Sequence, residues 1–148
     1  MFSIRLFGLS ALIFGAFFLK YRAQFARRTF AQRVTVLLIL VSVLMGSDYV
    51  LFQVPGSIFK ARASGTLSIH YFYGATAATI FTFAELAAAI DLVRGRREFM
   101  KWLLPPILYL FVVGILGGIF GNSIQLLADS GRALLVFIFS YFASRTLR

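Results

Sequence analysis

Glu85 is the residue whose type and position in this sequence could do chemistry. It lies in the apolar stretch 70–93, which reads HYFYGATAATIFTFAELAAAIDLV, nine residues before Arg94. At about 1.5 Å per helical residue, Glu85 would lie about 13 Å from the charged end of this stretch, close to the middle of a bilayer. An ionised carboxylate costs on the order of 3 kcal/mol there. The sequence therefore predicts that Glu85 is protonated, hydrogen-bonded or in contact with water.

Two interpretations of Glu85 remain open. In the functional one the carboxyl lines a proton or ion path, or binds a cation; in the structural one it is protonated and bonds a neighbouring helix. Helical spacing puts small and polar residues on the face of Glu85 and bulky Ile80 and Phe83 on the other side. Small side chains let helices approach closely in lipid, so this face is expected to pack inward. Its other members are Tyr71, Gly74, Ala78, Thr82 and Ala89.

Counting residues from the basic loops predicts which groups share the depth of Glu85. Ser42 follows Arg33 by nine positions, and Tyr109 follows the second basic loop by eight. Both would lie about 12–14 Å from the same membrane edge as Glu85. We expect at least one of these hydroxyls near the Glu85 carboxyl, in a mid-membrane polar site that also includes Thr82. No Lys or Arg is expected at this depth, so a buried salt bridge within one chain is not expected.

The composition is that of an integral membrane protein. The chain has 148 residues, of which 60% are hydrophobic and only 14% charged. Its net charge of +10 lies in short clusters between apolar runs, which indicates contact with anionic lipid headgroups and not with nucleic acid. No Cys is present, and a single His with five acids gives no metal-ligand set, so no metal or cofactor is expected. A nucleophile with a base and paired carboxylates are also missing, so an enzyme is not expected.

The apolar runs predict an all-α, polytopic transmembrane helix bundle that forms one membrane domain over residues 1–148. The first run is interpreted as a retained span because Lys20, not a small-residue cleavage site, follows it. The second is expected to end at Pro55 and Gly56. The last is short and spans only if the arginines at its two ends snorkel, so without it the chain has four spans. The five predicted spans are about 6–19, 34–54, 71–93, 102–121 and 131–144.

The distribution of Lys and Arg predicts the orientation. Eleven of the fifteen fall on one side of the five-span arrangement and four on the other. The positive-inside rule then places the N-terminus outside and the C-terminus in the cytoplasm, in a multi-pass protein of the bacterial inner membrane. Arg5 is expected to snorkel outward, and Asp48 to be an interfacial residue near Lys60 or Arg62. The basic residues expected at the cytoplasmic lipid headgroups include Arg22, Arg27, Arg28, Arg33, Arg94, Arg96 and Arg97.

Glycines in the stretch 102–121 form two small-xxx-small pairs, Gly114 with Gly118 and Gly117 with Gly121. Such spacing is typical of close packing on another helix, and a flexible pore hinge is the alternative. One functional hypothesis is a homo-oligomeric channel or transporter, with these glycines and the face of Gly74 and Ala78 as interfaces. The second is a non-catalytic membrane partner protein: an accessory subunit, an exclusion or immunity protein, or a defence component. An enzyme acting on lipid or quinone is a third, and it lacks the groups such chemistry needs.

Overall fold

The computed structural model describes residues 2–66, 70–121 and 124–147, and this part of the chain is all-helical, with 90% helix and no strands. Four of its helical segments are long and apolar enough to cross a membrane: Ile4–Ala26, Phe30–Ser64, Ala75–Val93 and Phe99–Phe120. In chain order the elements are α1 (Phe2–Ala26), α2 (Phe30–Asp48), the π-helical turn η1 (Tyr49–Gln53), α3 (Val54–Ser64), α4 (His70–Val93), α5 (Phe99–Phe120) and α6 (Ile124–Arg145).

The connection between α1 and α2 is much shorter than the sequence suggested. The predicted spans 6–19 and 34–54 leave the basic stretch 20–33 between them, but α1 continues to Ala26 and only residues 27–29 connect the helices. Thr29 and Gln32 form a capping box at the start of α2, in which each side chain accepts a hydrogen bond from the other's backbone N–H. The Arg33 guanidinium donates to the carbonyl oxygens of Arg28 and Ala26, at 2.9 Å each. These side-chain bonds to backbone groups stabilise the tight turn.

Helices α2 and α3 form one continuous rod through η1. The helix does not end at Pro55 and Gly56 as expected, because it runs on to Ser64. Pro55 lies in the first turn of α3, and the widened turn before it lets the Val54 N–H bond to the Tyr49 carbonyl. The rod has 35 residues. At about 1.5 Å per residue it is about 52 Å long, well beyond a hydrocarbon core of about 30 Å.

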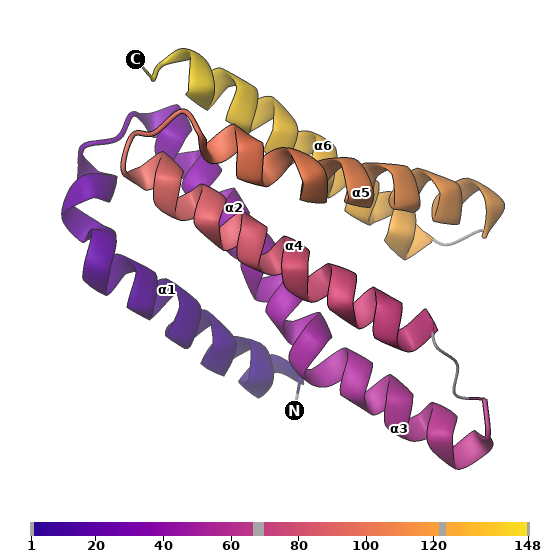
Figure 1. The fold of residues 1–148 in the computed structure, drawn as a ribbon. Helices are drawn as coiled ribbons and strands as arrows, with labels where there is room; N and C mark the ends of the chain where they lie inside the picture. The colour runs from indigo at the N-terminus through magenta and orange to yellow at the C-terminus, as the bar shows by residue number, and fades with distance from the viewer. Residues whose placement is uncertain (1, 67–69, 122–123, 148) are drawn as a thin grey trace.

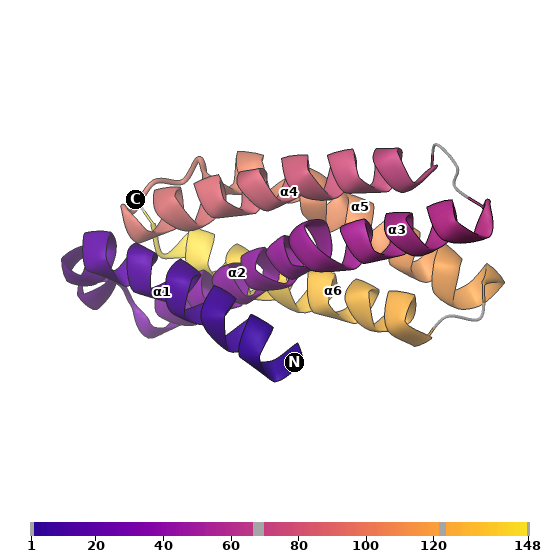
Figure 2. The same ribbon diagram turned by 90° about the horizontal axis from the view of Figure 1, so that it is seen from below.

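The core forms where α2 packs between α4 and α6, with α5 against both α4 and α6 (Figures 1 and 2). Helix α1 lies on the outside of the bundle and contacts mainly α2, through Phe17 among other residues. The side chains of the core that are wholly buried are Val36, Ile39 and Leu40 of α2, Ala88, Ala89, Leu92 and Val93 of α4, Phe99 of α5 and Ala143 of α6. The small side chains of α4 keep it close to its neighbours.

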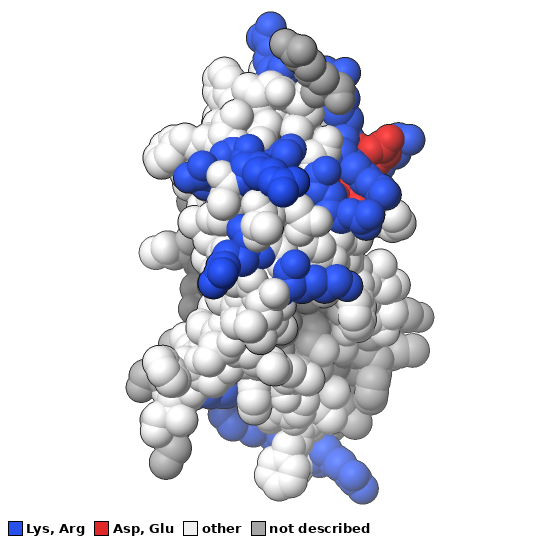
Figure 3. Space-filling model, turned by 90° about the vertical axis from the view of Figure 1, so that its left-hand side faces the viewer, with Lys and Arg blue, Asp and Glu red and all other residues white. Residues whose placement is uncertain are grey.

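Positive charge gathers at one end of the bundle. The connections α1–α2 and α4–α5 and the end of α6 all lie there, at the left in Figure 1. We call it the basic end; Figure 3 shows Lys and Arg covering much of it. The α1–α2 and α4–α5 connections touch there, since the Arg28 guanidinium lies against Gly95. Gly95 has a φ of +80°, a backbone conformation that favours glycine. The Gln32 side chain also donates to Thr146 Oγ1 at 2.5 Å, which ties the end of α6 to α2.

Helix α6 begins earlier than expected. The predicted span 131–144 placed Arg132 at its edge, but the helix runs from Ile124 to Arg145. Arg132 therefore lies about 12 Å from the start of the helix, well within it. Helix α6 is not among the four segments that qualify as spans in the described part of the chain, so its crossing of the membrane stays a prediction. The first helix is likewise longer than the predicted 6–19.

Candidate functional site

Glu85 lies on the buried face of α4. Its residue is 6% exposed, and the buried positions Ala88, Ala89 and Leu92 follow it at helical spacing. These alanines favour the helix and leave space for neighbouring backbones. The carboxyl group is therefore held inside the bundle and not on its lipid-facing side.

The close contact between α2 and α4 determines which residues of α2 lie opposite Glu85. A Cβ on Gly46 of α2 would collide with Oγ1 of Thr82, which donates to the Ala78 carbonyl at 2.7 Å. The two helices are antiparallel (Figure 1), so residues before Gly46 lie opposite residues after Thr82. Ser42, four residues before Gly46, is thus level with Glu85, three residues after Thr82. Ser42 is 6% exposed, and no hydrogen bond joins these two described side chains.

Tyr109 lies farther from this cluster. Its ring packs against Phe81 of α4, with 4.8 Å between the ring centroids, and its residue is 39% exposed. Phe81 is one turn before Glu85 on α4. Tyr109 therefore lies at the rim of the α4–α5 contact and outside the buried polar group.

Arg132 brings a positive charge to the carboxyl from α6. Its Nη1 lies 2.7 Å from Sδ of Met45, the residue before Gly46 and so about one helical turn from the level of Glu85. No salt bridge joins Glu85 and Arg132 among the described residues. The expectation that no Lys or Arg reaches this depth is wrong, because the early start of α6 puts the half-buried Arg132 beside Met45. We call Glu85 and Arg132 the inner pair.

A line of polar side chains runs from the basic end towards the inner pair, along the contact of α2 with α6. Thr35 Oγ1 lies 2.7 Å from the Ala31 carbonyl oxygen and 3.1 Å from that of Phe139. Ser140 is fully buried, and its hydroxyl has no hydrogen-bond partner among the described residues. Sequence reasoning missed this line, although the spacing of its α2 members on one helical face was a usable signal. We call it the polar seam; it comprises Gln32, Thr35, Ser42, Ser140 and Thr146.

A second charged contact joins α1 to the end of α2. Arg5 binds Asp48 with Nε 2.6 Å from Oδ1 and Nη2 3.3 Å from Oδ2, and Gln53 donates to Oδ2 at 2.8 Å. Asp48 is only 2% exposed. The partner of Asp48 is therefore Arg5, and not Lys60 or Arg62 as expected. The long α1 brings Arg5 alongside the end of α2, and we call this contact the Arg5–Asp48 clamp.

The predicted glycine face of α5 packs within the chain. A Cβ on Gly118 would lie 2.9 Å from Cβ of Leu127 of α6, Gly114 is buried, and Ser130 Oγ donates to the Phe111 carbonyl at 3.2 Å. Gly117 and Gly121 meet at the end of α5, where the Gly121 N–H bonds to the Gly117 carbonyl at 3.0 Å. This face therefore serves the α5–α6 contact.

The remaining predicted residues are spread over the molecule. Arg22, Arg27, Arg94, Arg96 and Arg97 are exposed near the basic end. The Arg28 guanidinium lies against Gly95, and Arg33 donates to backbone carbonyls of the α1–α2 connection. Tyr71 and Gly74 lie outside the residues whose side chains the structure describes. Within the described residues, no three His, Cys, Asp or Glu side chains are grouped to hold a metal. No family model, no curated protein and no solved structure matches this chain.

Proposed function

We propose that this chain is a small membrane transport protein in which the inner pair handles a proton or a small ion. The observation that carries the proposal is a buried carboxylate on α4 that lies near the depth of a guanidinium from α6. Charged groups within apolar helices are costly, on the order of 3 kcal/mol each, and they mark ion pathways and proton relays when they face a bundle interior. A carboxyl that can bind and release a proton beside a permanent cation is a suitable proton carrier.

The proposed topology has five spans: α1, α2 with η1, α4, α5 and α6. Helix α6 has 22 residues, and it returns along α5 to the basic end. At about 33 Å it is long enough to cross a bilayer. With the basic end in the cytoplasm, the N-terminus lies outside, in a bacterial inner membrane. Helix α3 then extends beyond the outer face of this bilayer.

The pathway is proposed to run within each chain. The two faces expected to join copies of the chain, around Gly118 and around Thr82, are occupied by α6 and α2 of the same chain. A homo-oligomer would therefore form through outward surfaces such as that of α1. The inner pair of each chain would then lie away from the symmetry axis.

The polar seam is the proposed route between the inner pair and the cytoplasm. It is closed in this conformation, because Val36 and Ile39 are wholly buried beside it. Conduction would require α6 to move against α2. Ser140 supports such an opening, since its buried hydroxyl lacks a partner at a cost of about 1–3 kcal/mol, which water entering an open seam would relieve.

A non-catalytic membrane partner protein is the second candidate. The observation that favours it is the position of Arg132 near the depth of Glu85, because two opposite charges can also serve only to hold α4 and α6 together. Helix α1 adds a large exposed apolar surface, with only Leu9 and Phe17 buried among its described hydrophobic residues, on which a helix of another protein could pack.

Flux measurements separate the two candidates. The purified protein is reconstituted in liposomes that contain a pH-sensitive dye, and a pH gradient is imposed with and without a potassium diffusion potential. Transport predicts gradient dissipation above protein-free liposomes and its loss in Glu85→Gln. The control is Lys60→Gln, an exposed charge of α3 outside the inner pair and the polar seam, which should keep the wild-type rate. A Glu85→Gln protein with undiminished flux, or a wild type without flux, would leave the inner pair with a structural role.

A further inference from the structure

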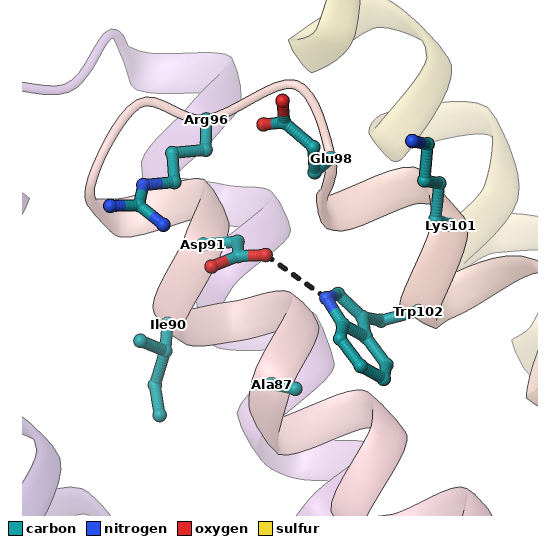
Figure 4. Close-up of a pocket in the computed structure, with 7 residues that line it drawn as sticks. All are labelled: Ala87, Ile90, Asp91, Arg96, Glu98, Lys101 and Trp102. Carbon is teal, nitrogen blue, oxygen red and sulfur yellow. Dashed lines mark hydrogen bonds between the residues drawn. The ribbon is translucent and has the colours of Figure 1, made fainter.

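A groove opens between α4 and α5 next to the basic end (Figure 4). Ala87 and Ile90 give it an apolar wall, and Trp102 lies across from them. The Trp102 indole donates from Nε1 to Oδ2 of Asp91 at 3.1 Å, which holds the ring in place. Trp102 is 50% exposed, as expected for a ring at the level of lipid headgroups. We call this hollow the α4–α5 groove.

Charges of both signs surround the groove. Arg96 and Lys101 supply two cations, and Asp91 and Glu98 supply two carboxylates. Figure 4 shows Glu98 on the rim between Arg96 and Lys101, with Asp91 deeper beside Trp102. The chain has only five acids against fifteen bases, so two carboxylates in one groove of the basic end set it apart from its surroundings. A ligand that carries only negative charge would complement the cations and leave both carboxylates facing it.

We propose that the α4–α5 groove binds the headgroup of a phospholipid with a primary amine, that is, a phosphoethanolamine group. The phosphate would bind Lys101, because ammonium groups are usual phosphate donors, and Arg96 would add positive charge on the other side of Glu98. The ammonium would bind Glu98 and the free oxygen of Asp91, and an acyl chain would follow Ala87 and Ile90 along α4. A primary ammonium offers three N–H donors to carboxylates, whereas the quaternary amine of choline offers none.

This inference does not depend on the transport proposal. The groove lies at the headgroup level, and its residues are not part of the inner pair or of the polar seam. A lipid held between α4 and α5 would support their connection from outside.

The only tryptophan of the chain lies in the groove, so its fluorescence reports on the site alone. The intact protein is reconstituted in vesicles of phosphatidylcholine and phosphatidylglycerol, and the fraction of one lipid brominated on its acyl chains is raised. Brominated phosphatidylethanolamine, phosphatidylcholine and phosphatidylglycerol are compared as quenchers of Trp102. We expect phosphatidylethanolamine to bind about threefold or more better than phosphatidylcholine, as one exposed charge-assisted contact allows. Equal quenching by these two lipids overturns the proposal, and so does the strongest quenching by phosphatidylglycerol, which would reflect net charge alone.

Substitutions separate recognition of the amine from recognition of the phosphate. Glu98→Gln should lower the quenching by phosphatidylethanolamine to that by phosphatidylcholine. Lys101→Gln should weaken the binding of all three lipids to a similar extent. Arg22→Gln, an exposed cation of α1 outside the groove, is the control and should leave the curves unchanged. Circular dichroism checks that each variant is folded, and a folded Glu98→Gln protein that retains the preference for the amine contradicts the proposal.

Discussion

Arg132 of α6 lies close to the depth of Glu85 of α4, although 46 residues separate them in the sequence. A positive charge near this depth offsets part of the cost of burying the carboxylate. Removing one partner leaves the other charge buried and uncompensated, which is more costly than removing both. The pair therefore links the positions of two helices that flank α2.

Arg132→Gln is expected to lower stability on the order of 2 kcal/mol, because it leaves Glu85 without its countercharge. The double variant with Glu85→Gln should recover a substantial part of that loss. Unfolding of the four proteins in the same detergent gives the coupling energy. Strictly additive losses would mean that the two side chains do not stabilise each other.

Gly46→Ala is expected to lower stability by about 1–3 kcal/mol, because the new Cβ would collide with Oγ1 of Thr82. Combining it with Thr82→Ala should restore much of the loss, since the colliding atom is then absent. Gly56→Ala is the matched control, as a Cβ there has nothing within 4 Å. Thermal unfolding in detergent compares these three variants with the wild type, and equal effects of Gly46→Ala and Gly56→Ala would contradict the close α2–α4 contact.

Asp48→Asn is expected to loosen α1 from the bundle. The Arg5–Asp48 clamp is a two-contact ion pair at a residue only 2% exposed, whereas most of α1 is exposed. Breaking such a pair costs about 3 kcal/mol. Hydrogen exchange followed by mass spectrometry should show faster exchange in the first half of α1, with little change in α5. Lys60→Gln serves as the control, and unchanged exchange in Asp48→Asn would show that other contacts hold α1.

The topology can be tested with single cysteines, because the natural chain contains none. Phe120→Cys at the end of α5 and Thr146→Cys after α6 are both exposed. If α6 crosses the membrane, a membrane-impermeant maleimide added to intact cells labels Cys at 120 and reaches Cys at 146 only after permeabilisation. Labelling of both from outside would reduce the bundle to four spans.

The lengths of the apolar runs predicted the all-helical fold of this chain well. In lipid the backbone N–H and C=O groups must bond to each other, and helices are one of the few structures that allow this. The helix ends were harder to predict. Pro55 and Gly56 are usual helix breakers, yet the π-helical turn accommodates them inside a longer rod. Helix α6 starts seven residues before the predicted edge, in a stretch whose polar residues resemble a loop.

The prediction of the candidate site depended on where the helices begin and end. Glu85 stood out because it is a carboxylate in an apolar run, a property of one helix alone. Its partner Arg132 and the polar seam depend on the register between helices, which residue counting within single helices does not provide. An error of seven residues at the start of α6 amounts to about 10 Å along the helix, enough to move Arg132 from the predicted edge to the interior.

The rod from Phe30 to Ser64 is about 20 Å longer than the hydrocarbon core of a bilayer is thick. Its two parts, α2 and α3, run in different directions in Figure 1, and the π-helical turn η1 lies between them. In the proposed topology α3 is outside the membrane, whereas Gly46 and Ser42 are inside it. A partner that binds Lys60 or Arg62 would therefore act on the α2–α4 contact through η1.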